Sequence, residues 1–298
     1  MSSALHRPSG HLAAGPYAAA LTPDDAGWGH AGLRVIELAA GERHEFDTGD
    51  DEVLVLPLAG SCVVECGGEK AELAGRPSVF TSLTDFAYVP PTRHVRLSSP
   101  DGGRFALPSA LARAGHPFRH VPASAVQVEL RGAGACSRQV NNFATPAVLD
   151  ADRIIACEVL TPGGNWSSYP PHKHDEERRH AGRLTESILE EIYYFEVADG
   201  PGGPGLGYQR GYGTADRPLD LLAEVRTGDV VLVPHGWHGP SIAGPGYDLY
   251  YLNVMAGPGD ERQWKICDDP AHAWVRDSWP SQTVDPRLPL YGSAGRSS

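Results

Sequence analysis

The chain has 298 residues, 41% of them hydrophobic and 21% charged, a composition typical of a globular protein. Its net charge of −12 argues against nucleic acid as a partner, because phosphate binding requires a basic surface. The longest apolar runs are far too short to span a bilayer, and the N-terminal sequence MSSALHRPSGHLAAG lacks the apolar core of a secretion signal. We therefore expect a cytoplasmic protein that binds neither nucleic acid nor membranes.

The composition also bears on secondary structure and cysteine chemistry. With 35 glycines and 26 prolines, the chain favours many short strands and turns over long helices. The five cysteines are an odd and scattered set without the paired spacing of a zinc or disulfide framework. We interpret them as reduced structural thiols: Cys62, Cys66, Cys136, Cys157 and Cys267.

The first half of the chain is predicted to form one β domain over residues 31–135. Residues 1–30 are rich in Ala, Gly and Pro and are predicted to be a loose N-terminal lead-in. From Leu33, short apolar runs separated by Gly, Pro and Asp indicate strands: LRVIEL, EVLVLPLAG, SCVVEC, DFAYVP, HVRLSS and VQVELRG. The segment LPSALARAG, residues 107–115, is predicted to be a short helix or a linker.

The second half is predicted to form another β domain, with its tail, over residues 136–298. Its strand-like runs begin at Ile154 and read IIACEVL, EIYYFEV, LGYQRGY, LLAEVRT, DVVLVP and YDLYYLNVM. Little of the chain has helical periodicity. We therefore predict an all-β fold of two antiparallel barrels or sandwiches, with few helices, rather than one α/β domain.

The two halves resemble each other in sequence. Glu52 opens EVLVLPLAG as Glu191 opens EIYYFEV, and DFAYVPPTRH parallels DVVLVPHGWH, ending at His94 and His238. A repeat on this scale indicates a duplicated barrel. Where the second half has HKH, the first has ERHEFDTGDDE, with only His44. We therefore predict that the first copy has lost its metal site.

Three histidines and one glutamate mark a candidate metal site in the second half. His172 and His174 are two residues apart, and side chains with this spacing in a strand point to the same side. Glu191 begins one apolar strand, and His238 lies in the turn after another. Three imidazoles and a carboxylate form a ligand set that suits Zn, Mn, Fe or Ni.

Strand alternation guides the choice of the glutamate. Glu191, rather than its neighbour Glu190, shares a face with Tyr193 and Phe195, whose aromatic side chains suit the interior of a barrel. We therefore prefer Glu191 as the ligand and keep Glu190 as the alternative. His235 lies close to the site in sequence and is the second choice among the histidines.

Four further side chains are candidates for substrate binding. Arg138, in a polar segment, and Arg210 carry guanidinium groups that match carboxylates, although an inter-domain contact is an equal alternative for Arg138. Tyr250 and Tyr251 are candidates for substrate contact, with core packing as the alternative. The sequence contains no phosphate-binding loop, dinucleotide-binding turn or nucleophile elbow, which argues against those catalytic classes.

Several of these phrases resemble known families. The HKH pair, the following glutamate and GDVVLVPHGWH resemble the two motifs of cupins, with one residue rather than two between Gly236 and His238. More specifically, NNFATP, CEVLTPGGNWSSYPPHKHDE, EEIYYF, GDVVLVPHGWH and GYDLYYLNVMAGP resemble the 5-deoxy-glucuronate isomerase family of myo-inositol catabolism. The resemblance extends over nearly the whole chain, from GDDEVLVLPLAGSC to DPAHAW.

The resemblance implies a bicupin, two tandem jelly-roll barrels of which the C-terminal one holds a divalent metal. It implies the reversible conversion of 5-deoxy-D-glucuronate, a small anionic sugar acid, to 5-dehydro-2-deoxy-D-gluconate. The related 5-keto-4-deoxyuronate isomerases carry zinc on three histidines and one glutamate, which by motif position fall on His172, His174, Glu191 and His238. Zinc is thus the favoured metal, with Mn, Fe or Ni as alternatives, and a homo-oligomer, dimeric or larger, is a further expectation.

The implied isomerisation moves a hydrogen between C2 and C1. We hypothesise that the cation stabilises an enediolate as a Lewis acid while a base moves the proton. Glu191, Tyr251 and His235 are the candidate bases, and Arg138 and Arg210 are the candidate partners of the substrate carboxylate; a hydride shift would need no base. Two other classes stay open, namely a cupin dioxygenase on a small substrate and a non-catalytic sugar-binding cupin.

Overall fold

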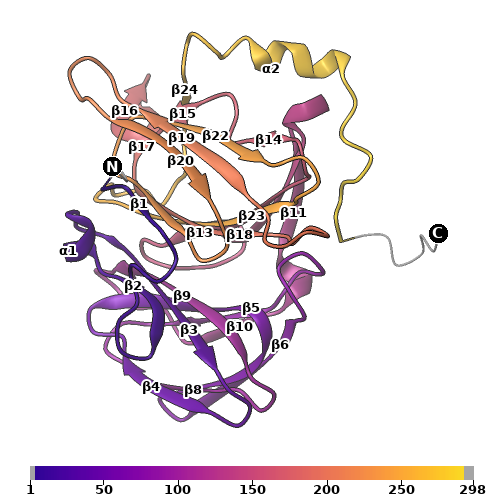
Figure 1. Cartoon of the computed structure of the whole chain (residues 1–298). Helices are drawn as coiled ribbons and strands as arrows, with labels where there is room; N and C mark the ends of the chain where they lie inside the picture. Colours follow the sequence, from indigo (N-terminus) through magenta and orange to yellow (C-terminus); the bar gives the residue numbers. More distant parts are fainter. Residues whose placement is uncertain (1–3, 292–298) are drawn as a thin grey trace.

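The protein, described over residues 4–291 in a computed structural model, consists of two β-sheet halves stacked on each other (Figure 1). The first half lies below in indigo and magenta, and the second lies above in orange and yellow. The helices that the structure describes are short: α1 (Pro23–Ala26), α2 (Val275–Ser278) and 3-10 turns at Ala123–Ala125, Gly134–Cys136 and Trp279–Ser281. None of them has the length and apolarity that a transmembrane helix requires. This architecture confirms the all-β prediction.

The first half is a nine-stranded antiparallel sheet. Its main path runs β10-β7-β5-β9-β3-β2, and β4, β6 and β8 attach to β5 or to one another. The strands are β2 (Tyr17–Leu21), β3 (Ala31–Leu38), β4 (Arg43–Asp47), β5 (Asp51–Cys66), β6 (Glu69–Arg76), β7 (Phe86–Val89), β8 (His94–Ser98), β9 (Gly103–Leu111) and β10 (Arg119–Val121). Apolar side chains such as Val55, Val64, Leu97 and Phe105 fill the interior of this half.

The second half is built from two larger sheets and a hairpin. A seven-stranded sheet runs β1-β21-β18-β23-β13-β12-β11, and a six-stranded sheet runs β20-β19-β22-β15-β24 with β14 beside β22. The first sheet comprises β1 (His6–Arg7), β11 (Gln127–Arg131), β12 (Arg138–Ala144), β13 (Ile155–Thr161), β18 (Glu190–Val197), β21 (Val230–Val233) and β23 (Leu249–Ala256). The second comprises β14 (Trp166–Ser167), β15 (His172–Lys173), β19 (Gly207–Tyr212), β20 (Asp220–Val225), β22 (Trp237–Ala243) and β24 (Cys267–Asp268), and the hairpin is β16 (Asp175–His180) with β17 (Arg183–Ile188).

The strand order repeats between the halves, as the sequence echo suggested. In the first half β7, β5, β9 and β3 are consecutive neighbours, and in the second β21, β18, β23 and β13 are. The echoed segments thus take the same places, since β7 pairs with β5 and β21 pairs with β18. The two halves therefore share an architecture, although the interior of the first is filled with apolar side chains.

The central strands of the seven-stranded sheet, β13, β18, β21 and β23, are buried on both faces. Alternate residues of β18 and β23, such as Ile192 and Leu252, pack against the first half in a core that the two halves share. Their neighbours Tyr193 and Tyr251 point the other way, into the interior of the second half. This double burial explains why both strands are almost continuously apolar in sequence. It also fixes which residues of these strands can reach the interior site.

The prediction of a loose N-terminal lead-in is wrong for the residues that the structure describes. β1 adds to the edge of β21 in the second half, and β2 pairs with β3 in the first. The α1 helix between them begins at a capping box formed by Thr22 and Asp25. Small residues such as Ala give little strand signal, so pairing with an existing sheet edge, which the local sequence does not reveal, orders this segment. Residues 1–3 and 292–298 lie outside the described part of the chain.

Two further expectations are corrected. Residues 107–115 do not begin a helix, because β9 runs on to Leu111 and pairs with β3 and β5. The predicted boundary at 135/136 also lies too late in the chain. β11 already belongs to the sheet of the second half, where it forms a hairpin with β12, so the changeover falls between β10 and β11.

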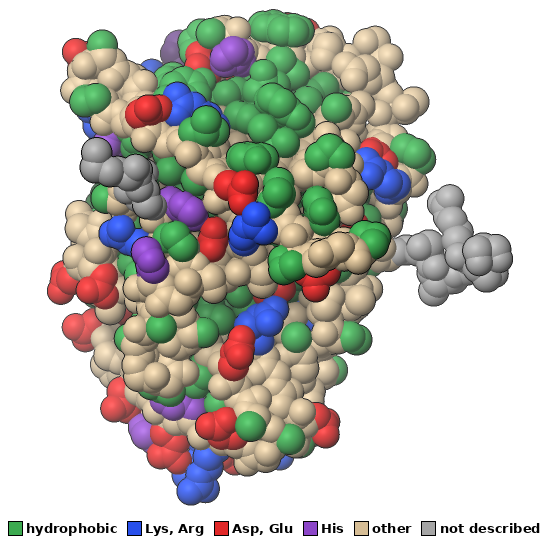
Figure 2. All heavy atoms as spheres, in the orientation of Figure 1, with side chains coloured by type: hydrophobic (Ala, Val, Ile, Leu, Met, Phe, Trp, Pro, Cys, Tyr) green, Lys and Arg blue, Asp and Glu red, His purple; other side chains and the backbone are tan. Residues whose placement is uncertain are grey.

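Apolar side chains are also exposed on the second half. In the space-filling view they gather in the upper part of the visible face (Figure 2). The most exposed large apolar side chain is Leu222 of β20, at 75%, and Tyr208 and Trp166 on the same six-stranded sheet are also exposed. Exposed apolar surface is common where subunits meet. The expected homo-oligomer itself stays a prediction.

Glu52 joins the two halves. Its buried carboxylate accepts hydrogen bonds from the backbone N–H groups of Asp152, Arg153 and Ile154, at 2.9, 2.6 and 2.6 Å, and from the hydroxyl of Tyr88 at 2.9 Å. Four donors thus converge on one carboxylate. Glu52, which corresponds to Glu191 in the sequence repeat, therefore has a structural role: it holds residues 152–154 of the second half against the first half.

We expect Glu52→Gln to lower the free energy of unfolding by about 1–3 kcal/mol, because the amide nitrogen would leave buried donors unpaired. Urea denaturation followed by circular dichroism measures the change. The exposed Glu69→Gln on β6 is the control and should leave stability unchanged. If the two variants unfold alike, the assignment of this role to Glu52 is wrong.

Candidate metal centre

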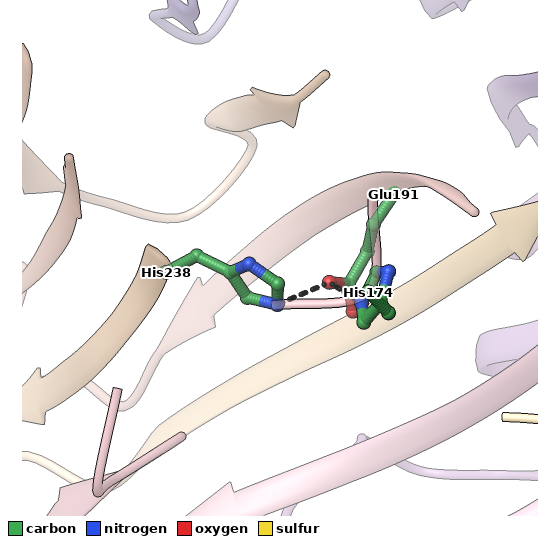
Figure 3. A group of neighbouring side chains, drawn as sticks. All are labelled: His174, Glu191 and His238. Atoms are coloured by element: carbon green, nitrogen blue, oxygen red, sulfur yellow. Dashed lines mark hydrogen bonds and ion pairs between the residues drawn. The ribbon is translucent and has the colours of Figure 1, made fainter. Parts of the chain in front are cut away.

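His174, Glu191 and His238 converge at a candidate metal site in the interior of the second half (Figure 3). Glu191 Oε2 lies 3.1 Å from His174 Nε2 and 3.0 Å from His238 Nε2, and all three side chains are buried. Tetrahedral ligands with metal bonds of about 2.1 Å lie about 3.4 Å apart. The three donor atoms therefore need little movement to enclose one cation.

The orientation of the imidazoles supports this use. Nδ1 of His174 lies 3.3 Å from the carbonyl oxygen of Leu189, and Nδ1 of His238 lies 3.2 Å from that of Gly236. Because a carbonyl can only accept, Nδ1 carries the proton and Nε2 is left as the donor atom, the usual arrangement behind a metal-binding histidine. Two such Nε2 atoms facing a carboxylate require a positive charge, either a proton or a metal, between them.

The pKa values follow from the same contacts. Burial alone would raise the pKa of Glu191, but hydrogen bonding and charge from His174 and His238 lower it to about 2. Burial alone would lower the pKa of His174, but the hydrogen bond to Glu191, the charge of Glu191 and two backbone hydrogen bonds together outweigh burial and raise it. Glu191 is therefore ionised at neutral pH, as a metal ligand must be. Its Oε1 atom is buried and has no hydrogen-bond partner in the described part of the chain.

His172 lies beside this trio rather than within it. Its ring centroid is 4.5 Å from that of His238 and 6.3 Å from that of His174. Its Nδ1 lies 3.4 Å from the carbonyl oxygen of Pro170, so its Nε2 is also free as a donor. Burial, and then the charges of the other two histidines, hold its pKa well below the usual value. A neutral imidazole at this distance is placed to become the fourth ligand that the sequence predicted.

The register between β15 and β22 brings the histidines together. His172 pairs directly with His238 across these antiparallel strands. The Asp175 carboxylate accepts a hydrogen bond from the Gly236 N–H at 2.9 Å and so ties the two histidine segments together. Gly236 has φ +84°, and a Cβ there would come within 2.7 Å of the Tyr212 carbonyl oxygen, so this turn requires glycine.

The structure places Glu191, not Glu190, at this site. The two residues lie on opposite faces of β18, and Glu190 points toward the N-terminal segment. There its carboxylate accepts hydrogen bonds from the backbone N–H groups of Gly29, His30 and Ala31 at 2.8, 2.8 and 2.9 Å. The alternation argument therefore identified the glutamate that faces the two histidines.

A cavity of about 170 Å³ opens beside the trio. His172 and Tyr193 bound it on one side. The ring centroid of Tyr193 lies 6.3 Å from that of His238, a member of the trio. Three arginines, Arg131, Arg138 and Arg276, line it as well. A ligand in this cavity would thus lie between the candidate metal site and a cluster of positive charge.

Arg138 differs from the other two arginines in lacking a counter-ion. Arg131 donates two hydrogen bonds to Glu129, and Arg276 donates two to Asp268. Arg138 donates to the carbonyl oxygens of Cys136 and Tyr169 at 3.1 and 3.4 Å, and no carboxylate among the described residues lies within 4.0 Å of it. Burial lowers its pKa to about 10, so the guanidinium stays charged at neutral pH.

A buried charge without a partner is unfavourable unless an anion neutralises it. The Arg138 side chain is only 4% exposed, and the Trp279 ring lies 5.6 Å from its guanidinium carbon. The two neighbouring arginines add positive charge around it. This end of the cavity therefore suits the carboxylate of a small ligand.

Tyrosine hydroxyls line the cavity wall next to the trio. Burial raises the pKa of Tyr193 and Tyr251 above the usual value, so both phenols keep their protons at neutral pH. Ser168 Oγ lies 3.0 Å from the Tyr251 hydroxyl and 3.3 Å from that of Tyr193. Tyr251, one of the predicted bases, is therefore a neutral phenol at rest.

Three predicted site residues lie elsewhere. Arg210 points out of the sheet because Gln209 takes the inward position on β19, and it pairs with Asp220. Tyr250 faces the core shared by the two halves and donates a hydrogen bond to Glu158 at 2.9 Å. His235 does not line the cavity. Strand alternation accounts for the first two, since each is one residue away from an inward position.

Several lining residues were missed in the sequence. Asn253 is 2% exposed, and its Nδ2 atom has no hydrogen-bond partner among the residues described. Its place two residues after Tyr251 on β23 was a usable signal, because the two share a face. Trp264 and Ser168 carried no such signal, because they reach the cavity from loops or strand ends.

Comparison with known proteins gives the family. A model described as the KduI/IolB family matches residues 5–275. The chain belongs to the KduI/IolB family. Among curated members, a 5-deoxy-glucuronate isomerase of Geobacillus kaustophilus is 41% identical over 262 residues, which cover 87% of this chain and 90% of the relative. That relative is an isomerase by name, which confirms the prediction of an enzyme of this class.

Solved structures of the family and of more distant proteins agree. An IolB-like protein of Salmonella typhimurium matches with a TM-score of 0.81 and 33% identity, covering 91% of this chain and 98% of that one. An oxalate decarboxylase of Lactobacillus farciminis matches with a TM-score of 0.61 and 12% identity, covering 90% and 89%. The second likeness concerns the fold alone, and it confirms the predicted cupin fold.

We expect His238→Ala to lose bound metal, because it removes one of the three converging donor atoms. Loss of a group behind a ligand already weakens metal binding by about 10–100-fold, so loss of the ligand should cost at least that. Elemental analysis after dialysis measures the metal content. His180→Ala, on the exposed β16 strand, is the control and should retain metal. Equal metal content in both variants would contradict the site.

Proposed function

We propose that this member of the KduI/IolB family is a metal-dependent isomerase that converts 5-deoxy-D-glucuronate to 5-dehydro-2-deoxy-D-gluconate. The observation that carries the proposal is a single cavity with a three-donor metal site near one wall and the unpaired Arg138 at another. A sugar acid with a carbonyl at one end and a carboxylate at the other matches this separation of chemistry. The name of the 41% identical relative supports the same substrate.

His174, Glu191 and His238, with His172 as the fourth donor, would hold the cation in the second of two tandem cupin barrels. Zinc is favoured by this donor set, and Mn, Fe or Ni remain alternatives. A divalent cation here would act as a Lewis acid on the substrate carbonyl and stabilise the negative charge of an enediolate. Substrate binding and proton transfer would be carried out by the side chains of the cavity wall.

Those side chains divide into binding and proton-moving groups. Arg138 binds the carboxylate and so fixes which end of the substrate approaches His172. Tyr193 and Tyr251 are neutral phenols at the cavity wall, where their oxygens can form hydrogen bonds with the substrate. Glu191, one of the predicted bases, is ionised, and its Oε1 atom, which has no hydrogen-bond partner among the described residues, is the proposed proton acceptor. The pathway implied by the sequence resemblance is inositol degradation, and we propose the cytoplasm as the compartment.

A test of the reaction uses purified protein, 5-deoxy-D-glucuronate and deuterated water, with the product followed by NMR. We expect turnover with deuterium at the carbon that receives the hydrogen, loss of turnover after chelation, and recovery with zinc or manganese. Turnover without any deuterium would favour a hydride shift. Full activity of the chelated protein would refute metal dependence. Oxygen consumption with an aromatic substrate, or binding without turnover, would favour the dioxygenase and sugar-binding alternatives respectively.

We expect Arg138→Met to lower kcat/KM by about 10–100-fold, mainly through KM, because it removes charge-assisted hydrogen bonds to the substrate carboxylate. Steady-state kinetics measure this effect. Arg210→Met is the matched control, since it removes the same group from outside the cavity and should leave kcat/KM near the wild-type value. An equal effect of the two substitutions would remove Arg138 from the substrate site.

A further inference from the structure

Ser168 has an unusual backbone conformation for a serine. Its φ is +47°, in the left-handed region where residues with a Cβ are disfavoured. The backbone of Ser168 packs closely against that of Gly239: a Cβ on Gly239 would lie only 1.8 Å from the Ser168 carbonyl oxygen. This close packing holds the conformation of Ser168. Glycine would adopt this backbone without the steric cost. The presence of serine therefore directs attention to its hydroxyl, which lies at the cavity wall.

The hydrogen bonds behind this hydroxyl have a fixed direction. Ser167 Oγ donates to the backbone carbonyl oxygen of Ser241 at 3.2 Å, and a carbonyl can only accept. With its proton used, Ser167 Oγ accepts from the hydroxyls of Thr161 and Tyr251 at 2.7 and 2.9 Å. The phenol proton of Tyr251 is thus committed to Ser167.

The same assignment of hydroxyl protons can be continued to the side chains at the cavity wall. Because the Tyr251 proton is used, Ser168 must be the donor in the 3.0 Å hydrogen bond between their hydroxyls. Ser168 then has no proton left, so Tyr193 is the donor in the 3.3 Å hydrogen bond to Ser168. The Tyr193 oxygen is left with acceptor capacity alone. A ligand group that meets this oxygen must therefore bring a proton.

We propose that Ser168 is a positioning residue that makes Tyr193 a hydrogen-bond acceptor and thereby selects a substrate with a hydroxyl at that point. A carbonyl oxygen at the same place would face the Tyr193 oxygen with no proton between them. Sites built to accept a substrate hydroxyl reject analogues that lack it, because a buried polar atom is then left unpaired. The inference rests on the proposed function for the identity of the substrate, but the direction of the chain rests on the hydrogen bonds alone.

The decisive variant is Ser168→Gly, which removes the hydroxyl and relieves the backbone. Its matched control is Ala181→Gly, at another left-handed residue (φ +48°) in the exposed turn between β16 and β17. We expect thermal midpoints and metal contents near wild type for both variants. We expect kcat/KM with 5-deoxy-D-glucuronate to fall about 10–100-fold for Ser168→Gly alone, the usual effect of one lost hydrogen bond to a buried group.

A double-mutant cycle with Tyr193→Phe separates positioning from general disruption. If Ser168 acts through Tyr193, the double variant should be no worse than Tyr193→Phe alone. Fully additive losses, unchanged kinetics in Ser168→Gly, or a loss that parallels reduced metal content would overturn the proposal. Wild-type turnover separately tests the proposed function. If the wild type shows none, the same cycle is read from calorimetric binding of 5-deoxy-D-glucuronate to the zinc-loaded protein.

Discussion

The Glu191 carboxylate faces the Nε2 atoms of His174 and His238, and backbone carbonyls hold both imidazoles in that orientation. Two lone pairs and an anion cannot stay together in a buried space without positive charge. The remainder of the second half can be understood from this requirement. The β15–β22 register supplies His172 and His238, the Asp175–Gly236 hydrogen bond holds their segments together, and β18 supplies the carboxylate.

Charge is arranged in the opposite sense across the cavity. Around the trio a carboxylate needs a cation, whereas around Arg138 a guanidinium needs an anion. Arg131 and Arg276 have their own carboxylates, so among these three arginines Arg138 is the one suited to bind the anionic group of a ligand. A bifunctional ligand that is neutral or metal-binding at one end and anionic at the other satisfies both ends at once. Neither end alone would distinguish a sugar acid from a simple anion or a simple carbonyl compound.

The sequence predicted those parts of the structure that depend on local periodicity. Alternation in EIYYFEV selected Glu191 over Glu190, and the repeated phrases located the strands that occupy equivalent places in the two halves. Alternation was less useful in YYL, where both faces of the strand are buried and Tyr250 and Tyr251 look alike in sequence. Only the packing of the two halves decides which tyrosine faces the cavity.

Other parts depend on contacts between distant segments, which a single sequence does not encode in a readable form. Ser168 gains its place from packing against Gly239, and Arg138 is distinctive only because no carboxylate among the described residues lies within 4.0 Å of it. The N-terminal strand β1 depends on the free edge of β21, more than 200 residues later. The two arginine candidates lie in different places for the same reason: Arg138 lines the cavity and Arg210 does not, although their local sequence patterns do not distinguish them.

The shared core has a consequence for the role of the first half. One face of β18 and β23 supports the candidate site, while the opposite face is covered by the first half. Glu190 and Glu191, adjacent on one strand, serve these two faces, the former by anchoring residues 29–31 and the latter at the trio. Expressed alone, the second half would present Ile192, Tyr194 and Leu252 to water. The first half, whose own interior is filled with apolar side chains, thus covers the apolar face of the sheet that carries the candidate site on its other side.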